Sequence, residues 1–133
     1  MTPDAKAVAL DYMRAFEAKD KVKASSYLHT EGLYKGPLQS FQKAEAFVKE
    51  MSTFMYIAQS VSVKKLLADD TDVCVLWDYE TVIPSIPITP IAQWFKIENG
   101  KIRELHVYFN PVPFIAAKEK GEIKEALESV SRK

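Results

Sequence analysis

The sequence contains a single cysteine, Cys74, and only two histidines, His29 and His106. One thiol excludes an internal disulfide, a CxxC redox motif and a cysteine-rich zinc site. Two histidines are also too few for a histidine-rich metal cage. We therefore expect neither a metal site nor a bound cofactor.

An excess of charge of either sign is missing as well, because 18 basic side chains balance 18 acidic ones. Non-specific binding to nucleic acid needs many lysines and arginines gathered on one face of a protein. The balanced charge therefore argues against nucleic acid as a partner.

Long apolar runs are absent from the strand region, where the longest one extends only from Val73 to Trp77. A helix that crosses a bilayer needs roughly 20 apolar residues. Near the N-terminus, Asp4 and Lys6 precede any apolar stretch, which does not fit a secretory signal. We therefore expect a cytoplasmic protein that does not interact with a membrane.

The chain has 133 residues, of which 47% are hydrophobic. A folded chain of this length buries roughly 65–70% of the surface that it exposes when unfolded, which is enough for a core without metal or disulfides. No internal repeat, low-complexity tract or linker divides the sequence. We predict a single domain over residues 1–133.

Helical spacing of apolar residues dominates the first half of the chain. It predicts a helix that begins near Asp4, a short helix from Asp20 to about Leu28, and a third from about Gln42 to Met55. A short extended piece is expected at Leu33 to Lys35. One face of the first helix carries its apolar side chains, namely Val8, Tyr12, Ala15 and Phe16.

From Ile57 onward the apolar period changes toward two, which predicts strands. Asn99-Gly100 is the strongest hairpin signal in the chain, and a short amphipathic helix is expected from about residue 114. Helices first and strands afterwards predict an α+β domain whose helices cover one face of a sheet. The four long strands are expected around Val61 and Val63, and at Val73–Val82, Ile91–Glu98 and Lys101–Phe109.

The second face of this sheet is not plainly polar. Strand alternation places Leu76, Ile102 and Tyr108 on it, next to ionisable side chains. Since the helices occupy the first face of the sheet, a second copy of the chain is the simplest partner that could bury the second face. We predict a homodimer formed through the sheet face.

Four short motifs occur in an order and spacing that are typical of one superfamily. They are Tyr12 followed by Phe16 and Asp20, Leu33–Pro37, Phe95–Ile102, and Val107–Pro111. With them the chain resembles the nuclear-transport-factor-2-like superfamily, which includes ketosteroid isomerase and SnoaL-like polyketide cyclases. The resemblance implies a cone-shaped, curved antiparallel sheet with the N-terminal helices on its concave face, enclosing a deep apolar pocket.

The resemblance also assigns residues to this pocket. Alignment with the isomerase pattern points a set of strand residues inward, and a second set closes the pocket from the helical side. Trp77, Tyr79 and Trp94 form an aromatic cluster that either stacks on a flat ligand or simply belongs to the core. The complete set of pocket candidates is Tyr12, Phe16, Tyr34, Phe47, Met51, Val75, Trp77, Tyr79, Ala92, Trp94, Leu105, Val107, Phe109 and Asn110.

The isomerase mechanism uses an aspartate base, with a tyrosine and a protonated aspartate as its oxyanion hole. The resemblance places only the tyrosine in this sequence, at Tyr12, while Gly36 and Ala92 occupy the two carboxylate positions. Asn110 stands where many SnoaL-like relatives have an aspartate. Tyr12 is thus the candidate catalytic residue, and the general base is unidentified.

Three hypotheses follow. The leading one is a SnoaL-like domain that binds a small, largely apolar, aromatic or cyclic molecule. The first alternative is an enzyme of isomerase, cyclase or dehydratase type that uses Tyr12, and the second is a dimeric protein-interaction module. Asp78 and His106 are either an acid/base pair or polar groups at a subunit interface or rim, with strand alternation favouring the latter.

Overall fold

A curved six-stranded sheet organises the molecule, with strand order β2-β1-β6-β5-β4-β3. The computed structural model describes residues 4–131. The helices are α1 (Ala5–Glu17), α2 (Lys21–Ser26), α3 (Ala44–Tyr56), α4 (Val112–Glu119) and α5 (Glu122–Ser131). The strands are β1 (Leu28–Lys35), β2 (Ser40–Phe41), β3 (Ala58–Ala68), β4 (Asp72–Thr81), β5 (Thr89–Glu98) and β6 (Lys101–Tyr108).

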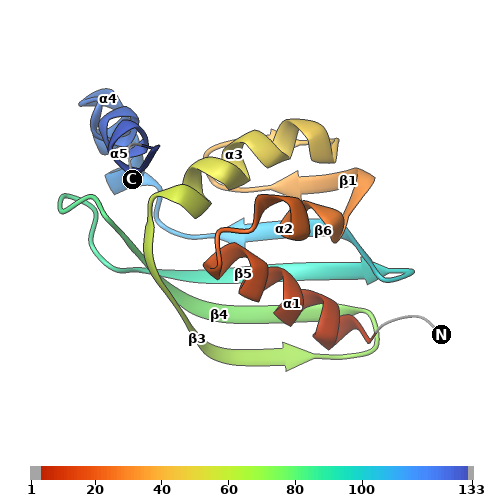
Figure 1. Ribbon diagram of the computed structural model, residues 1–133. Helices are drawn as coiled ribbons and strands as arrows, with labels where there is room; N and C mark the ends of the chain where they lie inside the picture. The colour runs from red at the N-terminus through yellow and green to blue at the C-terminus, as the bar shows by residue number, and fades with distance from the viewer. Residues whose placement is uncertain (1–3, 132–133) are drawn as a thin grey trace.

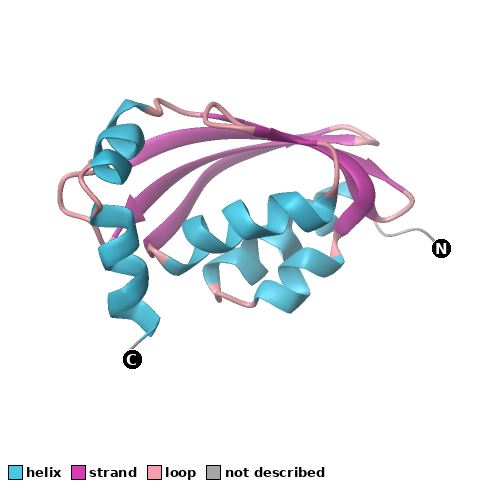
Figure 2. Cartoon of the chain, turned by 90° about the horizontal axis from the view of Figure 1, so that it is seen from above, coloured by secondary structure: helices cyan, strands magenta, loops and turns pink. Residues whose placement is uncertain are grey.

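Helices α1, α2 and α3 lie on the concave face of the sheet, which curves around them (Figures 1 and 2). This arrangement confirms the predicted α+β fold with the N-terminal helices on the concave side. The sheet is mixed rather than antiparallel, because β1 pairs with β6 in parallel. Consecutive strands from β3 to β6 are joined by short connections that impose antiparallel pairing, whereas no hairpin constrains β1 against β6.

Helix α1 begins where Asp4 caps it, since the Asp4 carboxylate accepts a hydrogen bond from the Lys6 amide at 3.3 Å. Its apolar stripe, which includes Val8, Tyr12 and Phe16, is buried against the sheet. Helix α2 ends at Ser26, earlier than predicted, and the strand expected from Leu33 already begins at Leu28.

Two turns, one before β4 and one after β5, are built by local turn chemistry. The Asp69 carboxylate accepts hydrogen bonds from the amides of Thr71 and Asp72 at 3.0 and 2.8 Å, which builds the β3–β4 turn. Asn99 and Gly100 have φ of 52° and 75°, the left-handed values that a two-residue hairpin turn requires. The Asn99-Gly100 turn was predicted.

A register shift lies between Lys96 and Ile97 in the pairing of β5 with β6. It adds one residue to β6, so that Ile102 and Leu105 both face the core although they are three positions apart. Ile102 has no exposed surface, and its amide donates to the Tyr27 carbonyl at 2.7 Å. The prediction that Ile102 lies on the outer face was therefore wrong.

Two helices follow the sheet where one was expected. Gly121, with φ of 77°, separates α4 from α5, and α4 already begins at Val112. Both helices stand beyond one end of the sheet, near the β4–β5 connection (Figure 1), where Ser85 donates to the Glu122 carboxylate at 3.0 Å. Among residues 4–131, no helix combines the length and the apolar character that crossing a membrane requires.

Candidate functional site

A cavity lies between the concave face of the sheet and the helices. About 70 Å³ of it is open to the centres of water-sized molecules, several times the roughly 10–15 Å³ that one water needs. Its walls come from α1, α3, the β1–β2 loop and the three central strands. The lining residues are Tyr12, Phe16, Lys35, Gly36, Pro37, Leu38, Gln39, Phe47, Glu50, Met51, Phe54, Trp77, Tyr79, Ile91, Gln93, Leu105, Val107 and Phe109.

Most of the predicted pocket residues line this cavity. Edge-to-face contacts fix the aromatic wall, with Phe16 against Trp77 at 5.9 Å and Trp77 against Tyr79 at 5.4 Å between ring centroids. Contact with a ligand remains a prediction for all of them. The predicted residues in the lining are Tyr12, Phe16, Phe47, Met51, Trp77, Tyr79, Leu105, Val107 and Phe109.

Trp94 and Ala92 do not line the cavity, and the prediction that they point inward was wrong. Side chains alternate along β5, where Ile91, Gln93 and Phe95 are buried on the concave face. Ala92 and Trp94 consequently face the outer surface. The resemblance shifted the inward set by one residue, which exchanges the two faces of a strand completely.

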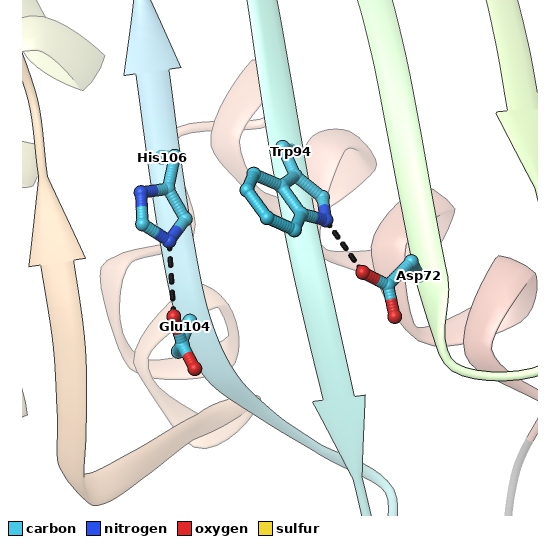
Figure 3. A network of polar contacts seen from close by, with 4 residues as sticks. All are labelled: Asp72, Trp94, Glu104 and His106. Atoms are coloured by element: carbon cyan, nitrogen blue, oxygen red, sulfur yellow. Dashed lines mark hydrogen bonds and ion pairs between the residues drawn. The ribbon is translucent and has the colours of Figure 1, made fainter.

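Trp94 belongs to a polar network on the outer face (Figure 3). Its indole nitrogen donates to the Asp72 carboxylate at 2.8 Å. Its ring stacks on the His106 imidazole with 4.7 Å between centroids, and His106 contacts the Glu104 carboxylate at 3.1 Å. The network satisfies these side chains without any contact with the cavity.

Three further pocket candidates lie elsewhere. Val75 is fully buried in the core behind the lining. Tyr34 stacks on Phe47 at 4.7 Å and donates its hydroxyl proton to the His29 carbonyl at 2.5 Å, so it supports the wall from outside. Asn110 is exposed, and its side-chain oxygen accepts from the Val112 amide at 3.1 Å at the start of α4.

Asp78 and His106 do not contact each other. Asp78 forms an ion pair with Lys64 at 3.7 Å, while His106 contacts Glu104. Both lie outside the cavity lining. The structure therefore offers no acid/base pair built from these two residues.

The buried tyrosine hydroxyls differ in their hydrogen bonding. Tyr79 donates to the Phe54 carbonyl at 2.5 Å, and Tyr34 donates to His29. Tyr12 is only 2% exposed, yet within residues 4–131 its hydroxyl has no hydrogen-bond partner. Burial raises the pKa of Tyr12 far above its ordinary value, so the hydroxyl keeps its proton and is available to a bound molecule.

Gln93 is a cavity residue that the sequence reasoning missed. It is 4% exposed, and its side-chain oxygen accepts a hydrogen bond from the Trp77 indole at 3.0 Å. The alternation of Ile91, Gln93 and Phe95 with Pro90, Ala92 and Trp94 was the signal that would have found it.

Glu50 is the second residue that was missed, and it carries the only carboxylate among the described lining residues. Partial burial raises the pKa of Glu50, while the Lys118 ammonium on α4 opposes the rise. The sequence signal was its position one helical turn after Phe47 and one before Phe54, on the apolar stripe of α3.

The two isomerase carboxylates have no counterpart at the positions that the resemblance names. Gly36 lines the cavity but carries no side chain, and Ala92 faces outward. The inward neighbours of Ala92 are Ile91 and Gln93, neither of which ionises at neutral pH. Among the described lining residues, Glu50 is the one that carries a carboxylate in place of these two.

Comparison with known proteins identifies the family of this domain and other proteins with its fold. A family model described as a SnoaL-like domain matches residues 9–105, which is more than half of the chain. A search of curated proteins found no match.

Solved structures share the fold. A protein from Kribbella flavida is 27% identical with a TM-score of 0.81, covering 88% of this chain and 95% of its own. A nuclear-transport-factor-2-like protein from Cytophaga hutchinsonii is 21% identical with a TM-score of 0.74, covering 86% and 97%. A steroid delta-isomerase from Pseudomonas aeruginosa is 15% identical with a TM-score of 0.73, covering 97% and 95%. At the last two identities the likeness concerns the fold alone.

Proposed function

This chain belongs to the SnoaL-like domain family, and on that premise we propose that its cavity binds a small, largely apolar molecule with an aromatic or cyclic body. The carrying observation is the wall of Phe16, Phe47, Trp77 and Tyr79 around a space that the protein's own side chains leave open. Apolar walls with a few placed polar groups are typical of small-molecule sites. The modest volume favours a ligand of about one ring over a large polycyclic one.

Filling the cavity tests this proposal. Met51 lines it from α3, whereas Ala46 is exposed on the same helix. In Met51→Trp the larger side chain occupies the ligand's space, so NMR shift perturbations by small aromatic probes such as ethylbenzene are expected to disappear. Ala46→Trp is the matched control and should keep the response.

Val107→Phe, also in the lining, gives a second filling variant should Met51→Trp fold poorly. A wild-type protein that responds to no member of a panel of small apolar and aromatic molecules would contradict the proposal. So would a Val107→Phe protein that binds the panel unchanged.

Glu50 favours a second candidate function, an enzyme of isomerase type. A carboxyl group in an apolar cavity with a raised pKa is typical of a general base. The Glu50 carboxylate would accept a proton from a carbon next to a ligand carbonyl and return it to another carbon of the same molecule. Tyr12 would donate a hydrogen bond to the carbonyl oxygen on which charge develops.

An ultraviolet assay of β,γ-unsaturated ketones tests the enzymatic candidate, because conjugation changes their absorbance. Wild type is expected to turn over a substrate that fits, and Glu50→Gln to lose roughly 10²- to 10⁴-fold in rate. Glu45→Gln, exposed on the same helix, is the control. Equal rates for wild type and Glu50→Gln would remove Glu50 from the reaction.

The outer face of the sheet supports a homodimer as the assembled form. Its exposed apolar side chains include Leu76, Trp94 and Tyr108, which are 37%, 37% and 55% exposed. The register brings them together, since Leu76 pairs with Ala92, Ala92 with Tyr108, and Cys74 with Trp94. A second copy placed on this surface would remove the patch from water.

Light scattering at micromolar concentration tests the assembly. Leu76→Lys is expected to convert the dimer to a monomer, while Val22→Lys, at an 82% exposed position, should not. A strict wild-type monomer would contradict the homodimer and favour a different protein as the partner of this face.

A further inference from the structure

Helix α4 packs against one end of the cavity and lies outside the stretch that matches the family model. The match ends at residue 105, whereas α4 begins at Val112. Membership of the family therefore does not describe what this helix does beside the cavity. The helix nevertheless belongs to the core, because its Phe114 and Ala117 side chains are buried.

The Phe114 ring contacts aromatic residues of the cavity lining that come from different parts of the chain. Its centroid lies 5.6 Å from that of Phe54 on α3, 6.1 Å from that of Tyr79 on β4 and 5.1 Å from that of Phe109, which follows β6. Phe54, Tyr79 and Phe109 line the cavity, but Phe114 does not. Phe114 therefore forms a layer directly behind this part of the wall.

Two of these lining rings depend on packing alone for their positions. The Tyr79 hydroxyl is anchored by its hydrogen bond to the Phe54 carbonyl. The side chains of Phe54 and Phe109 have no polar atom, are only partly buried, and pack edge-to-face at 6.2 Å between centroids. Because protein interiors leave few voids, the ring behind them determines how far they can retreat from the cavity.

A second interaction joins α4 to the same end of the cavity. The Lys118 ammonium opposes the rise in the pKa of Glu50 that partial burial causes. Glu50 also lines the cavity, one helical turn before Phe54 on α3. Phe114 and Lys118 are four positions apart, so they share one side of α4. This side of the helix faces the end of the cavity that the second half of α3 forms.

We propose that Phe114 sets the length of the apolar molecule that the cavity accepts, by holding Phe54 and Phe109 where they end the cavity. The inference rests on the proposed small-molecule function and adds the residue that limits the size of the ligand. Phe114 is a positioning residue, because it acts through lining side chains and does not touch the ligand. A segment outside the family model thereby adapts the shared fold to ligands of one length.

A series of alkylbenzenes measures this length: toluene, ethylbenzene, propylbenzene and butylbenzene. The members share one ring and differ only in the number of methylene groups. Each methylene that enters the cavity should tighten binding about fourfold, whereas one that meets the end wall should not. NMR titration of the full chain gives a dissociation constant for each member. For wild type we expect a cut-off within the series, beyond which binding no longer tightens.

Phe114→Ala is expected to move this cut-off to a chain at least one methylene longer, because Phe54 and Phe109 can move into the space that the ring leaves. Binding of toluene, the shortest member, should change least. Phe114→Leu removes fewer atoms and should shift the cut-off in the same direction if Phe114→Ala folds poorly. A merely structural role for Phe114 would weaken every member by a similar factor and leave the cut-off unchanged.

Ile97→Ala is the matched control. Ile97 is buried on β5 and does not line the cavity. It lies beside the β5–β6 turn, at the end of the sheet opposite α4 (Figure 1). This variant also loses core packing and stability, but it should keep the wild-type cut-off.

The outcomes distinguish the role of Phe114 from the proposed function. An unchanged cut-off in both Phe114→Ala and Phe114→Leu overturns that role and leaves small-molecule binding intact. An equal shift in Ile97→Ala also overturns it, since general loosening of the core then accounts for the change. So does a wild-type affinity that keeps rising to butylbenzene, because no end wall then limits the ligand. If wild type binds no alkylbenzene, the proposed function fails and the role of Phe114 fails with it.

Discussion

The two tryptophans lie on neighbouring strands and face opposite sides of the sheet. Trp77 lies on the concave face and is 5% exposed, and its indole N–H donates a hydrogen bond to the buried side-chain oxygen of Gln93. Trp94 lies on the outer face and is 37% exposed, and its indole N–H donates a hydrogen bond to the Asp72 carboxylate at the surface. The hydrogen bond is of similar length in both places, but in a single copy of the chain only the Trp94 hydrogen bond lies at a surface where water can replace it.

This contrast extends to the two faces as a whole. On the concave face, polar groups are few, and each either has a fixed partner or is left free toward the cavity. On the outer face, ionisable side chains such as Glu104 and His106 pair with one another beside solvent. A change on the concave face should therefore alter stability or ligand choice strongly, and a similar change outside should have a small effect.

The largest expected difference comes from adjacent residues on β5. Phe95 is fully buried and packs edge-to-face on Tyr12 at 5.7 Å, so Phe95→Ala should lower the free energy of unfolding by about 3–5 kcal/mol. Trp94→Ala, compared in the Leu76→Lys monomer, should cost about 1 kcal/mol, because the outer face of a single copy is accessible to water. Urea unfolding measures both, and equal losses would contradict the assignment of the two faces.

Gly32 is expected to show the next largest effect. A Cβ there would lie 2.4 Å from the Tyr34 hydroxyl oxygen and 2.9 Å from the Arg103 carbonyl. Gly32→Ala should therefore displace Tyr34 or separate β1 from β6, at a cost of about 1–3 kcal/mol. Gly36→Ala is the control, since its nearest contact is an ordinary 3.7 Å. Thermal unfolding compares the two, and a neutral Gly32→Ala would refute the close packing.

Replacing tyrosine by phenylalanine distinguishes a hydrogen-bonded hydroxyl from an unpartnered one on the concave face. Tyr79→Phe should cost about 1 kcal/mol, because the Phe54 carbonyl loses its donor. Tyr12→Phe should leave the free energy of unfolding within about 0.5 kcal/mol of wild type, since that hydroxyl has no partner within residues 4–131. A Tyr12→Phe protein as destabilised as Tyr79→Phe would show that the hydroxyl is structurally engaged.

Carboxyl titration gives the smallest effect, with opposite signs in the two regions. Burial raises the pKa of Glu50, so its contribution to stability is lost as pH rises through the raised value. Glu50→Gln should therefore gain stability relative to wild type between pH 4 and pH 7. The backbone amides around Asp69 lower its pKa, so the stability that its carboxylate supplies is present above its ordinary value and is lost as pH falls below about 4. The deficit of Asp69→Asn relative to wild type should therefore shrink on acidification below about pH 4, and urea unfolding across the two pH ranges checks the two signs.

Much of the fold was predictable because local sequence patterns determine these helices and turns, and no long-range contact changed them. Helical spacing located α1 and α3, and Asn99-Gly100 located the β5–β6 turn. The parallel pairing of β1 with β6 was not predictable, since it depends on residues about 70 positions apart that no local pattern connects. The register shift at Ile97 likewise moved Ile102 to the core against simple alternation.

The site was predictable only where apolar periodicity and the resemblance agreed. Tyr12, Phe47 and Trp77 satisfied both and line the cavity. On β5 the two disagreed, and the resemblance led to Trp94 although Lys96 and Glu98 share its side of the strand. Glu50 was not predicted, because a single charge on a helical stripe is equally compatible with a solvated edge.

The pairing of β1 with β6 has a consequence for how the molecule folds. Strands β3 to β6 are neighbours in sequence and close through short turns, whereas the Tyr34 hydroxyl must meet the Ile102 carbonyl across 68 residues. Closing so long a loop loses chain entropy before any contact offsets it, which makes such pairings slow. The β3–β6 meander should therefore assemble first, and during synthesis the N-terminal helices must wait for β6. The cavity is among the last parts of the protein to form.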